Sequence, residues 1–212
     1  MKNKSGITLI EVIVVVGLIA LLTGMAGAPF LTWYRRSNLE ESAGTLHETF
    51  KWAQSQAMKR GGVEMRNYSS QLIKKRIYVA VDATTGNYQV VQWRDDNHNG
   101  IRDNNEFSVL NSGSLGKGKA RFGLQPSVNK AACSDGTSDS DLVIRNFMPC
   151  PPVDLLNGQK CMRFDDKGFL TESMQNAGLF ITNDADSFAI ALNPAGIITL
   201  CRWSGTEWLF VR

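Results

Sequence analysis

The stretch GITLIEVIVVVGLIALLTGMAGAPFLTWY, residues 6–34, decides how the rest of this chain is interpreted. It places one carboxylate, Glu11, directly before 23 residues without a charge, Val12 to Tyr34. A helix needs roughly 20 mainly apolar residues to cross the hydrocarbon core of a membrane. The segment is therefore long enough to span a membrane. Glu11 needs a positively charged partner, because a carboxylate inside the bilayer is costly.

A secretory signal peptide is the first alternative, because Lys2 and Lys4 provide a positive region ahead of the apolar residues. Its apolar region would be about 7 to 15 residues long and would be followed by small residues at a cleavage site. Here the apolar run is longer, and the small residue, Gly6, precedes it. Cleavage after Gly6 would leave a mostly protonated α-amine on Ile7. This amine, on the same chain or on a neighbouring copy, is the cation expected for Glu11.

The residues from Gly6 to Glu11 resemble the class III signal of type IV pilins and type II secretion pseudopilins. In that family a prepilin peptidase cuts after the glycine and methylates the new N-terminus. The resemblance therefore implies cleavage between Gly6 and Ile7, N-methylation of Ile7 and a role for Glu11 in assembly. Two residues differ from the family pattern: Ile7 stands where phenylalanine is usual, and Pro29 lies one residue later than the usual helix proline.

The helical pattern continues beyond Tyr34 in amphipathic form. Apolar residues recur in steps of four and three, which places them on one face of a helix. These residues are Leu39, Ala43, Leu46, Phe50, Ala53 and Ala57. Gly61 and Gly62 are expected to end the helix.

Short β segments separated by turn residues follow Gly62. The predicted strands are 76–82, 88–93, 142–147, 178–182, 187–192, 196–203 and 207–212. They predict an α+β fold in which a long N-terminal α-helix packs on antiparallel β-sheet, which is the type IV pilin-like fold that the resemblance implies. The chain then divides into a leader at 1–6, a transmembrane or filament-core helix at 7–34, its amphipathic continuation at 35–62, and a periplasmic β-rich domain at 63–212.

The resemblance extends beyond the signal. Four segments are similar in order and spacing to those of the minor pseudopilin GspH and minor pilin FimT/FimU family: LHETFKWAQSQAMKRGG (46–62), WRDDNHNGIRDNNEF (93–107), MRFDDKGFLT (162–171) and FAIALNPAGIITLCRW (188–203). Residues 117–152 match no segment of that family.

The resemblance implies a minor pilin or pseudopilin subunit at or near the tip of a type IV pilus or of a type II secretion pseudopilus. Its partners would be other major and minor pilins or pseudopilins, the prepilin peptidase and the inner-membrane assembly platform. The precursor would cross the inner membrane once, with its C-terminal domain in the periplasm, before it joins the filament.

All four cysteines, Cys133, Cys150, Cys161 and Cys201, lie in the last 80 residues. With the positive leader in the cytoplasm, this region faces the periplasm, where disulfides persist. Four cysteines allow three pairings; we favour Cys133 with Cys150 and Cys161 with Cys201. Four buried free thiols are the alternative. A zinc site is disfavoured, because the chain has no CxxC pair and its histidines lie far from the cysteines in sequence.

The loop DDNHNGIRDNNE, residues 95–106, has the spacing of a calcium-binding loop. Its candidate ligands are Asp95, Asn97, Asn99, Asp103 and Glu106. Against calcium, Arg102 stands where such loops usually place an aliphatic residue, and strands rather than helices flank the loop. The alternative is a polar β-hairpin loop held by Asx turns. Calcium is the only cofactor that the sequence suggests.

The sequence predicts that the protein is not an enzyme. His47 and His98 have neither a plausible nucleophile nor a second histidine at metal-binding spacing. The chain contains no GxSxG, HExxH or phosphate-binding glycine loop. A periplasmic enzyme with a membrane anchor is the third hypothesis, after the two filament functions.

A DNA-binding competence pilin is the second hypothesis. The formal net charge is +3, and it falls to +1 when Lys2 and Lys4 are removed with the leader, so the mature chain has no overall basic character. FimT-like proteins that capture DNA carry arginines after the glycine of the C-terminal hairpin. Here Gly196 is followed by Ile197, Ile198 and Thr199, so DNA is not expected to be a partner.

Overall fold

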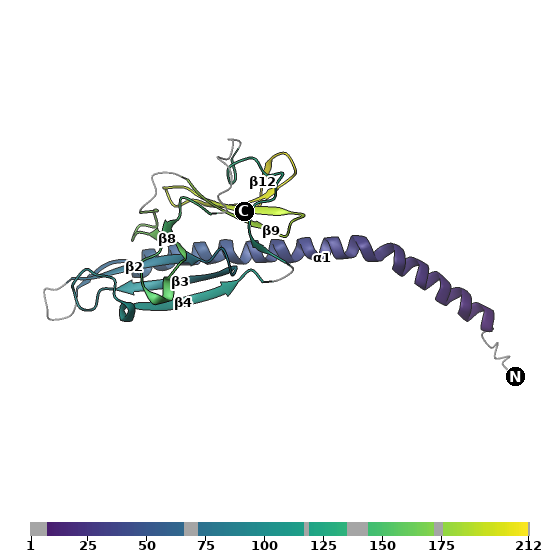
Figure 1. Cartoon of the computed structure of the whole chain (residues 1–212), viewed down its shortest axis with the longest axis horizontal. Coiled ribbons are helices and arrows are strands. Elements are labelled where there is room, and N and C mark those ends of the chain that lie inside the picture. Colours follow the sequence, from purple (N-terminus) through teal and green to yellow (C-terminus); the bar gives the residue numbers. More distant parts are fainter. Residues whose placement is uncertain (1–7, 66–71, 117–118, 135–143, 172–175, 212) are drawn as a thin grey trace. The chain divides into compact units, whose positions relative to one another are not determined.

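The computed structural model describes residues 8–65, 72–116, 119–134, 144–171 and 176–211 (Figure 1). The leader and the predicted cleavage and methylation site, Gly6 and Ile7, lie outside these residues. The chain divides into two compact units, Met1–Ser37 and Asn38–Arg212. This boundary lies close to residue 34, where the sequence predicts the end of the apolar part of the helix.

One helix, α1 (Leu9–Arg60), has 52 residues. Lys59 and Arg60 occupy its last turn, where positive side chains interact favourably with the helix dipole. The N–H of Gly61 then donates to the carbonyl oxygen of Ala57 at 2.7 Å. A Cβ on Gly61 would collide with that oxygen, so this helix end requires glycine, as the sequence predicts.

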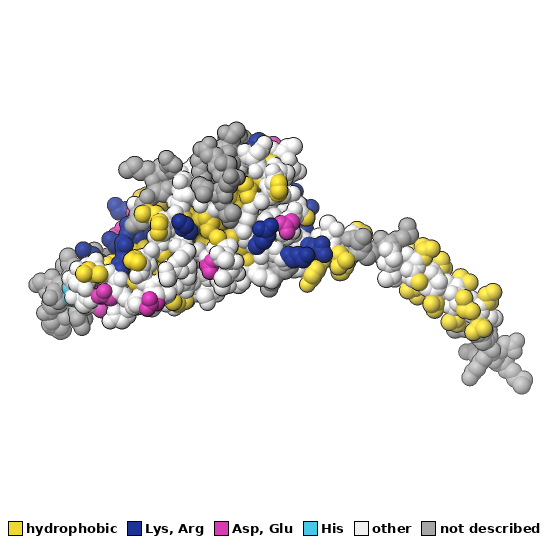
Figure 2. All heavy atoms as spheres, in the orientation of Figure 1, with side chains coloured by type: hydrophobic (Ala, Val, Ile, Leu, Met, Phe, Trp, Pro, Cys, Tyr) yellow, Lys and Arg dark blue, Asp and Glu magenta, His cyan; other side chains and the backbone are white. Residues whose placement is uncertain are grey.

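Within the described residues, neither stretch of α1 alone, Leu9–Gly24 or Pro29–Arg60, has the length and apolar character needed to cross a membrane, whereas the two stretches together meet that requirement by length and composition. Pro29 begins the second stretch, and proline cannot donate the backbone hydrogen bond of a helix interior. The described large apolar side chains of the first unit are all exposed, with exposed fractions between 49% (Val12) and 78% (Leu9). Figure 2 shows them along the segment that leads to the N-terminus.

The second unit contains two antiparallel sheets, with α1 between them (Figure 1). The first sheet has the order β4-β3-β2-β8-β7, and β1 also pairs with β2. Its strands are β1 (Gly62–Met65), β2 (Leu72–Val81), β3 (Asn87–Arg94), β4 (Phe107–Ser114), β7 (Met148–Pro149) and β8 (Lys160–Phe164). A 3₁₀ turn, η1 (Asn104–Glu106), precedes β4, and another, η2 (Asp154–Leu156), precedes β8.

The second sheet has the order β12-β11-β10-β9-β5, and β6 also pairs with β9. Its strands are β5 (Arg121–Phe122), β6 (Ile144–Arg145), β9 (Ala177–Thr182), β10 (Ser187–Leu192), β11 (Ile198–Trp203) and β12 (Trp208–Phe210). The strands β9 to β12 form the C-terminal meander that the turn residues predict.

The predicted apolar stripe of α1 forms the centre of the main core. All six of its residues, from Leu39 to Ala57, are fully buried. They belong to one cluster with inward side chains of both sheets, such as Val79 of β2 and Ile190 of β10. The structure therefore confirms the α+β class, with a long helix packed on antiparallel sheet.

Each sheet also carries a smaller apolar cluster on its other face, because successive side chains of a strand point to opposite faces. On the first sheet, Tyr78 and Ala80 pack with Val153 and Leu156 from the segment before β8. On the second sheet, residues of β9 to β12 pack with Val128 from the segment after β5. One disulfide lies in each cluster, Cys150–Cys161 in the first and Cys133–Cys201 in the second.

The disulfide pairing favoured from the sequence is wrong. The structure joins Cys133 to Cys201, 68 residues apart, and Cys150 to Cys161, 11 residues apart. Cys161 lies in β8 of the first sheet and Cys201 in β11 of the second, each in the cluster on the face away from α1. A disulfide requires Cα atoms within about 7 Å. Two cysteines on opposite outer faces cannot meet that requirement.

Gln54 joins α1 to one turn from each sheet. Its Nε2 donates to the carbonyl oxygens of Gly168, after β8, and of Gly196, between β10 and β11, at 2.8 and 2.7 Å. Both glycines have positive φ, +85° and +80°, which L side chains rarely adopt. A Cβ on Gly196 would collide with the Gly168 oxygen. The glycines of two family-like segments therefore let their turns meet over the helix.

Candidate functional site

Thr8 and Glu11 form the N-terminal cap of α1. The backbone N–H and the hydroxyl of Thr8 both donate to Glu11 Oε2 at 2.8 Å, and the N–H of Glu11 lies 3.4 Å from Thr8 Oγ1. This reciprocal arrangement is a capping box, whose sequence signature is Ser or Thr followed three residues later by Glu or Gln. The sequence shows that signature at residues 8–11, but the role of Thr8 was not predicted.

The capping box changes the chemistry expected of Glu11. One carboxylate oxygen already has two donors from Thr8, so Glu11 does not depend on a distant cation alone. Among the described residues, none donates a hydrogen bond to the other oxygen, Oε1, and the Glu11 side chain is exposed, so a cation can reach it. Ile7, whose amine is the predicted cation, precedes the described residues. Its pairing with Glu11 stays a prediction.

The exposed apolar surface of the first unit comprises described side chains from Leu9 to Leu22 and from Phe30 to Tyr34. It ends in three aromatic residues: the ring centroid of Phe30 lies 5.9 Å from that of Trp33 and 6.5 Å from that of Tyr34. Tryptophan and tyrosine are enriched where helices leave a membrane. Exposed apolar surface of this extent is typical of a site of protein or membrane interaction.

Glu106, the last candidate calcium ligand, is a buried carboxylate that the protein itself satisfies. Its Oε2 accepts a hydrogen bond from Trp93 Nε1 at 3.0 Å. Its Oε1 accepts hydrogen bonds from the backbone N–H groups of Asp96 and Asn97 at 3.1 and 3.3 Å. Glu106 therefore ties the start of the loop to its end.

The other candidate ligands also take part in bonds within the loop. Asp95 is buried and accepts from the N–H of Gly100 at 3.2 Å. The side-chain amides of Asn97 and Asn99 donate to Asp103 at 2.9 and 3.1 Å, and the N–H of Asn99 donates to Asn97 Oδ1 in an Asx turn. Within the described residues, no three His, Cys, Asp or Glu side chains are grouped to hold a metal ion. This geometry favours the hairpin loop.

Arg102 stands where calcium loops usually place an aliphatic residue, and its contacts account for that difference. Its guanidinium carbon lies 5.8 Å from the ring centroids of both Tyr78 and Trp93, within the range of cation–π attraction.

Calcium binding by this loop remains a prediction with a direct test. Millimolar calcium should raise the melting temperature of the protein if the loop binds it, and Asp95→Ala should remove the increase. An unchanged melting temperature would contradict calcium binding.

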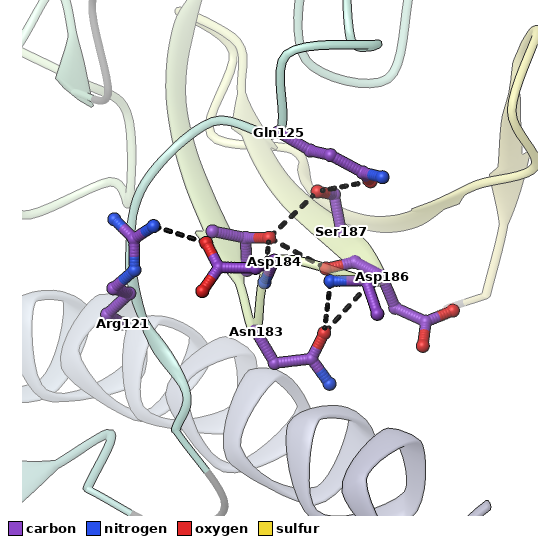
Figure 3. Close-up of polar contacts among 8 residues, drawn as sticks. Arg121, Gln125, Asn183, Asp184, Asp186 and Ser187 are labelled. Carbon is purple, nitrogen blue, oxygen red and sulfur yellow. Dashed lines mark hydrogen bonds and ion pairs between the residues drawn. The ribbon is translucent and has the colours of Figure 1, made fainter. Parts of the chain in front are cut away.

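The polar side chains at the turn between β9 and β10 form hydrogen bonds that hold the turn together (Figure 3). Ser187 is fully buried, and its hydroxyl lies 3.3 Å from Gln125 Oε1 and 3.2 Å from Thr182 Oγ1. Asn183 Oδ1 accepts from the N–H of Asp186 at 2.8 Å. Ser187 thus hydrogen-bonds to an amide and a hydroxyl, which do not activate a serine as a nucleophile.

His47 packs in the protein core and, among the described residues, does not lie in an active site. It is fully buried on α1, and its Nε2 lies 3.4 Å from the carbonyl oxygen of Ile198. Burial lowers its pKa, and the nearby charge of Lys51 lowers it further. Its environment therefore favours the neutral imidazole as part of the main interface between the helix and the second sheet.

Residues 1–27 match the family model described as the prokaryotic N-terminal methylation motif. The matched segment contains the predicted cleavage site, Gly6 and Ile7, and the capping residues Thr8 and Glu11. No curated protein and no solved structure matches the chain. The motif supports a type IV pilin-like protein, and it indicates a structural subunit rather than an enzyme.

Proposed function

We propose that this protein is a minor pilin or pseudopilin. It is inserted as a single-pass inner-membrane precursor, cleaved after Gly6, and assembled at or near the tip of a type IV pilus or of a type II secretion pseudopilus. The observation that carries this proposal is the methylation motif at residues 1–27 together with the exposed apolar side chains at 9–22 and 30–34. Such a surface needs lipid before assembly and neighbouring helices after it.

The capping box supports a specific docking step. Thr8 holds one oxygen of Glu11, while the other, which has no donor among the described residues, accepts a hydrogen bond from the N-terminal amine of Ile7 of a neighbouring subunit. When one charge of an ion pair buried among apolar helices is missing, the remaining charge has no partner, and its burial is costly. Glu11 therefore selects subunits whose leader has been removed.

The partners are other major and minor pilins or pseudopilins, the prepilin peptidase and the inner-membrane assembly platform. The second unit lies in the periplasm, an environment in which the two disulfides persist.

Cleavage is tested with Gly6→Ala. The peptidase site is expected to exclude a side chain at this position, so the intact mass of protein purified from cells should retain the first six residues, whereas wild-type protein should lack them. Ser5→Ala is the matched control and should be processed normally. Normal processing of Gly6→Ala would contradict the proposal.

Docking is tested with Glu11→Val. The variant should insert and be cleaved, because valine is less costly in a membrane than a carboxylate and the cleaved bond lies on the other side of Ile7. It should be missing from sheared filaments and should not co-purify with partner pilins. Glu40→Val, which removes an exposed carboxylate from the second unit, is the control. Wild-type amounts of Glu11→Val in filaments would show that docking does not need the carboxylate.

A DNA-binding competence pilin is the alternative function. The C-terminal hairpin does not favour it, because Ile197, directly after Gly196, is an apolar residue that is 60% exposed. DNA capture would appear as retention of duplex DNA at low salt that falls steeply as salt is added. Absence of retention at low salt would exclude this alternative.

A further inference from the structure

A basic groove of about 690 Å³ lies beside the C-terminal end of α1. Lys59 and Arg60 line it from the last helical turn, and Lys75 of β2 and Arg94 of β3 line it from the first sheet. Lys75 and Arg94 are cross-strand partners, so their side chains share a face. It is the face of Ile77, which packs in the main core. The groove therefore begins where α1 stops covering this sheet.

The lining of the groove has an excess of positive charge. Two carboxylates also line it, but Asp96 pairs with Arg94 at 2.9 Å, and Glu106 accepts the three N–H donors described above. Both Lys59 and Arg60 are exposed, and among the described residues no carboxylate pairs with either of them. These two cations are accessible to an external anion.

A sheet edge borders the same groove. Phe107 and Ser108, the first residues of β4, belong to its lining. Among the described strands, β4 pairs with β3 and with no other, so it forms one edge of the first sheet. The outer side of an edge strand presents backbone groups to which an extended peptide can hydrogen-bond. Gln92 and Asn105 add side-chain amides to the lining.

We propose that this groove binds an extended, acidic segment of a partner subunit. The carboxylates of the segment pair with Lys59 and Arg60, and its backbone lies along the start of β4. A peptide fits these features better than a chain of phosphates, because the edge strand offers both N–H and C=O groups, which a peptide backbone can pair with, whereas phosphate oxygens only accept hydrogen bonds. The inference rests on the proposed function only for the identity of the partner as a filament subunit.

The test uses the full chain in detergent micelles and fluorescently labelled probes. The first probe is a short peptide of alternating glutamate and threonine, the second has glutamine in place of glutamate, and the third is a short DNA duplex. Fluorescence anisotropy should show binding of the glutamate peptide and much weaker binding of the other two. Each exposed ion pair raises the binding affinity by up to about fivefold. The double variant Lys59→Gln/Arg60→Gln should therefore lower the affinity for the glutamate peptide roughly tenfold.

The matched control is Lys160→Gln/Lys167→Gln, which removes the same charge from exposed positions outside the groove. It should bind the glutamate peptide like the wild-type chain. Equal binding of the glutamate and glutamine peptides, or equal effects of the two double variants, would overturn the proposal. The proposal would also be overturned if the DNA duplex bound more tightly than the glutamate peptide and only the groove variant weakened that binding. None of these measurements requires cleavage or assembly, so their failure is distinguishable from failure of the Gly6 and Glu11 tests.

Discussion

The more hydrophobic part of α1 is the more exposed part, and the part with more polar residues contains the buried stripe. The part from Leu9 to Tyr34 is almost entirely apolar, yet Val16 and Leu22 are 60% and 63% exposed. The part from Leu39 to Arg60 contains many polar and charged residues, yet its apolar stripe is fully buried. The two sheets of the second unit cover that stripe, whereas the first part keeps its apolar surface for partners outside the chain, as the proposed function requires.

The difference shows that the pattern of apolar residues decides what can cover a helix. A stripe on one face matches the apolar face of a sheet, and the polar residues beside it remain in water. Apolar residues on all sides can be covered only by lipid or by several other helices. The same helix therefore contributes to an internal core in one part and, under the proposed function, contacts external partners in the other.

The largest effect should come from Phe50→Ala. Phe50 is fully buried, and its ring meets that of Phe147 edge to face at a centroid distance of 6.1 Å. Its removal should lower the free energy of unfolding by about 3 to 5 kcal/mol. The matched substitution in the first part, Leu18→Ala, should change it by less than about 0.5 kcal/mol, because Leu18 is exposed. Denaturant unfolding of the full chain in detergent measures the stability of both variants. Equal losses of unfolding free energy would contradict the difference in burial between the two parts of α1.

The disulfides should have the next largest effect, and they sharpen the comparison because they occur only in the unit that buries α1. Removal of either bridge should cost about 2 to 4 kcal/mol. Cys133→Ser/Cys201→Ser should cost more than Cys150→Ser/Cys161→Ser, because it opens a loop of 68 rather than 11 residues. Mass mapping of the oxidised wild-type protein should find these two linkages. A Cys133–Cys150 peptide would contradict the structure.

Gln54→Leu should have a smaller effect, of about 1 to 3 kcal/mol, since it leaves two partly buried carbonyl oxygens without their donor. Gln56→Leu on the same helix is the control, because no hydrogen bond joins its side chain to another described residue. The free energies of unfolding should therefore separate the two variants. Equal values would show that the Gln54 contacts do not help hold the second part of α1 between the sheets.

The smallest expected effect is a pH dependence of stability due to His47. Burial, and then Lys51, lower its pKa in the folded state, although the carbonyl of Ile198 and the carboxylate of Glu48 act in the opposite direction. The unfolded chain therefore binds a proton first, at an ordinary value of about 6.5. Stability should be complete above that pH and should fall as the pH decreases toward the folded-state pKa.

The measurement is the unfolding free energy as a function of pH in the weakly acidic range. His47→Gln should flatten the decrease, because glutamine does not titrate. A decrease of the same size in the variant would assign the pH dependence to other groups and remove His47 from the account of the buried helix face.

Strands with clear apolar alternation could be predicted from the sequence. The predicted strand at 187–192 coincides with β10, and that at 88–93 lies within β3. The strand β4 was not predicted, because its sequence FSVLNSGS contains few apolar residues. It is mostly exposed, and its place is determined by hydrogen bonds to β3. Local pattern does not reveal an edge strand of that kind.

The candidate site was predictable to different degrees in its different parts. Glu11 was found because a charge interrupts an apolar run, and the role of Thr8 could have been found from the capping-box spacing. The contacts of Gln54 could not, because they join residues 114 and 142 positions apart. The basic groove was hidden for the same reason, since Lys59, Lys75 and Arg94 belong to three different elements.

The sequence by itself determined the N-terminal signal, the long helix, its apolar stripe and the antiparallel strands of the C-terminal meander. These features depend on spacings of a few residues, which a helix or a strand converts directly into a common face. Only the tertiary structure decided the disulfide pairing, the meeting of two glycine turns over Gln54 and the collection of cations into one groove. These depend on which faces of two sheets enclose α1, and side chains far apart in the chain become neighbours only when that enclosure forms.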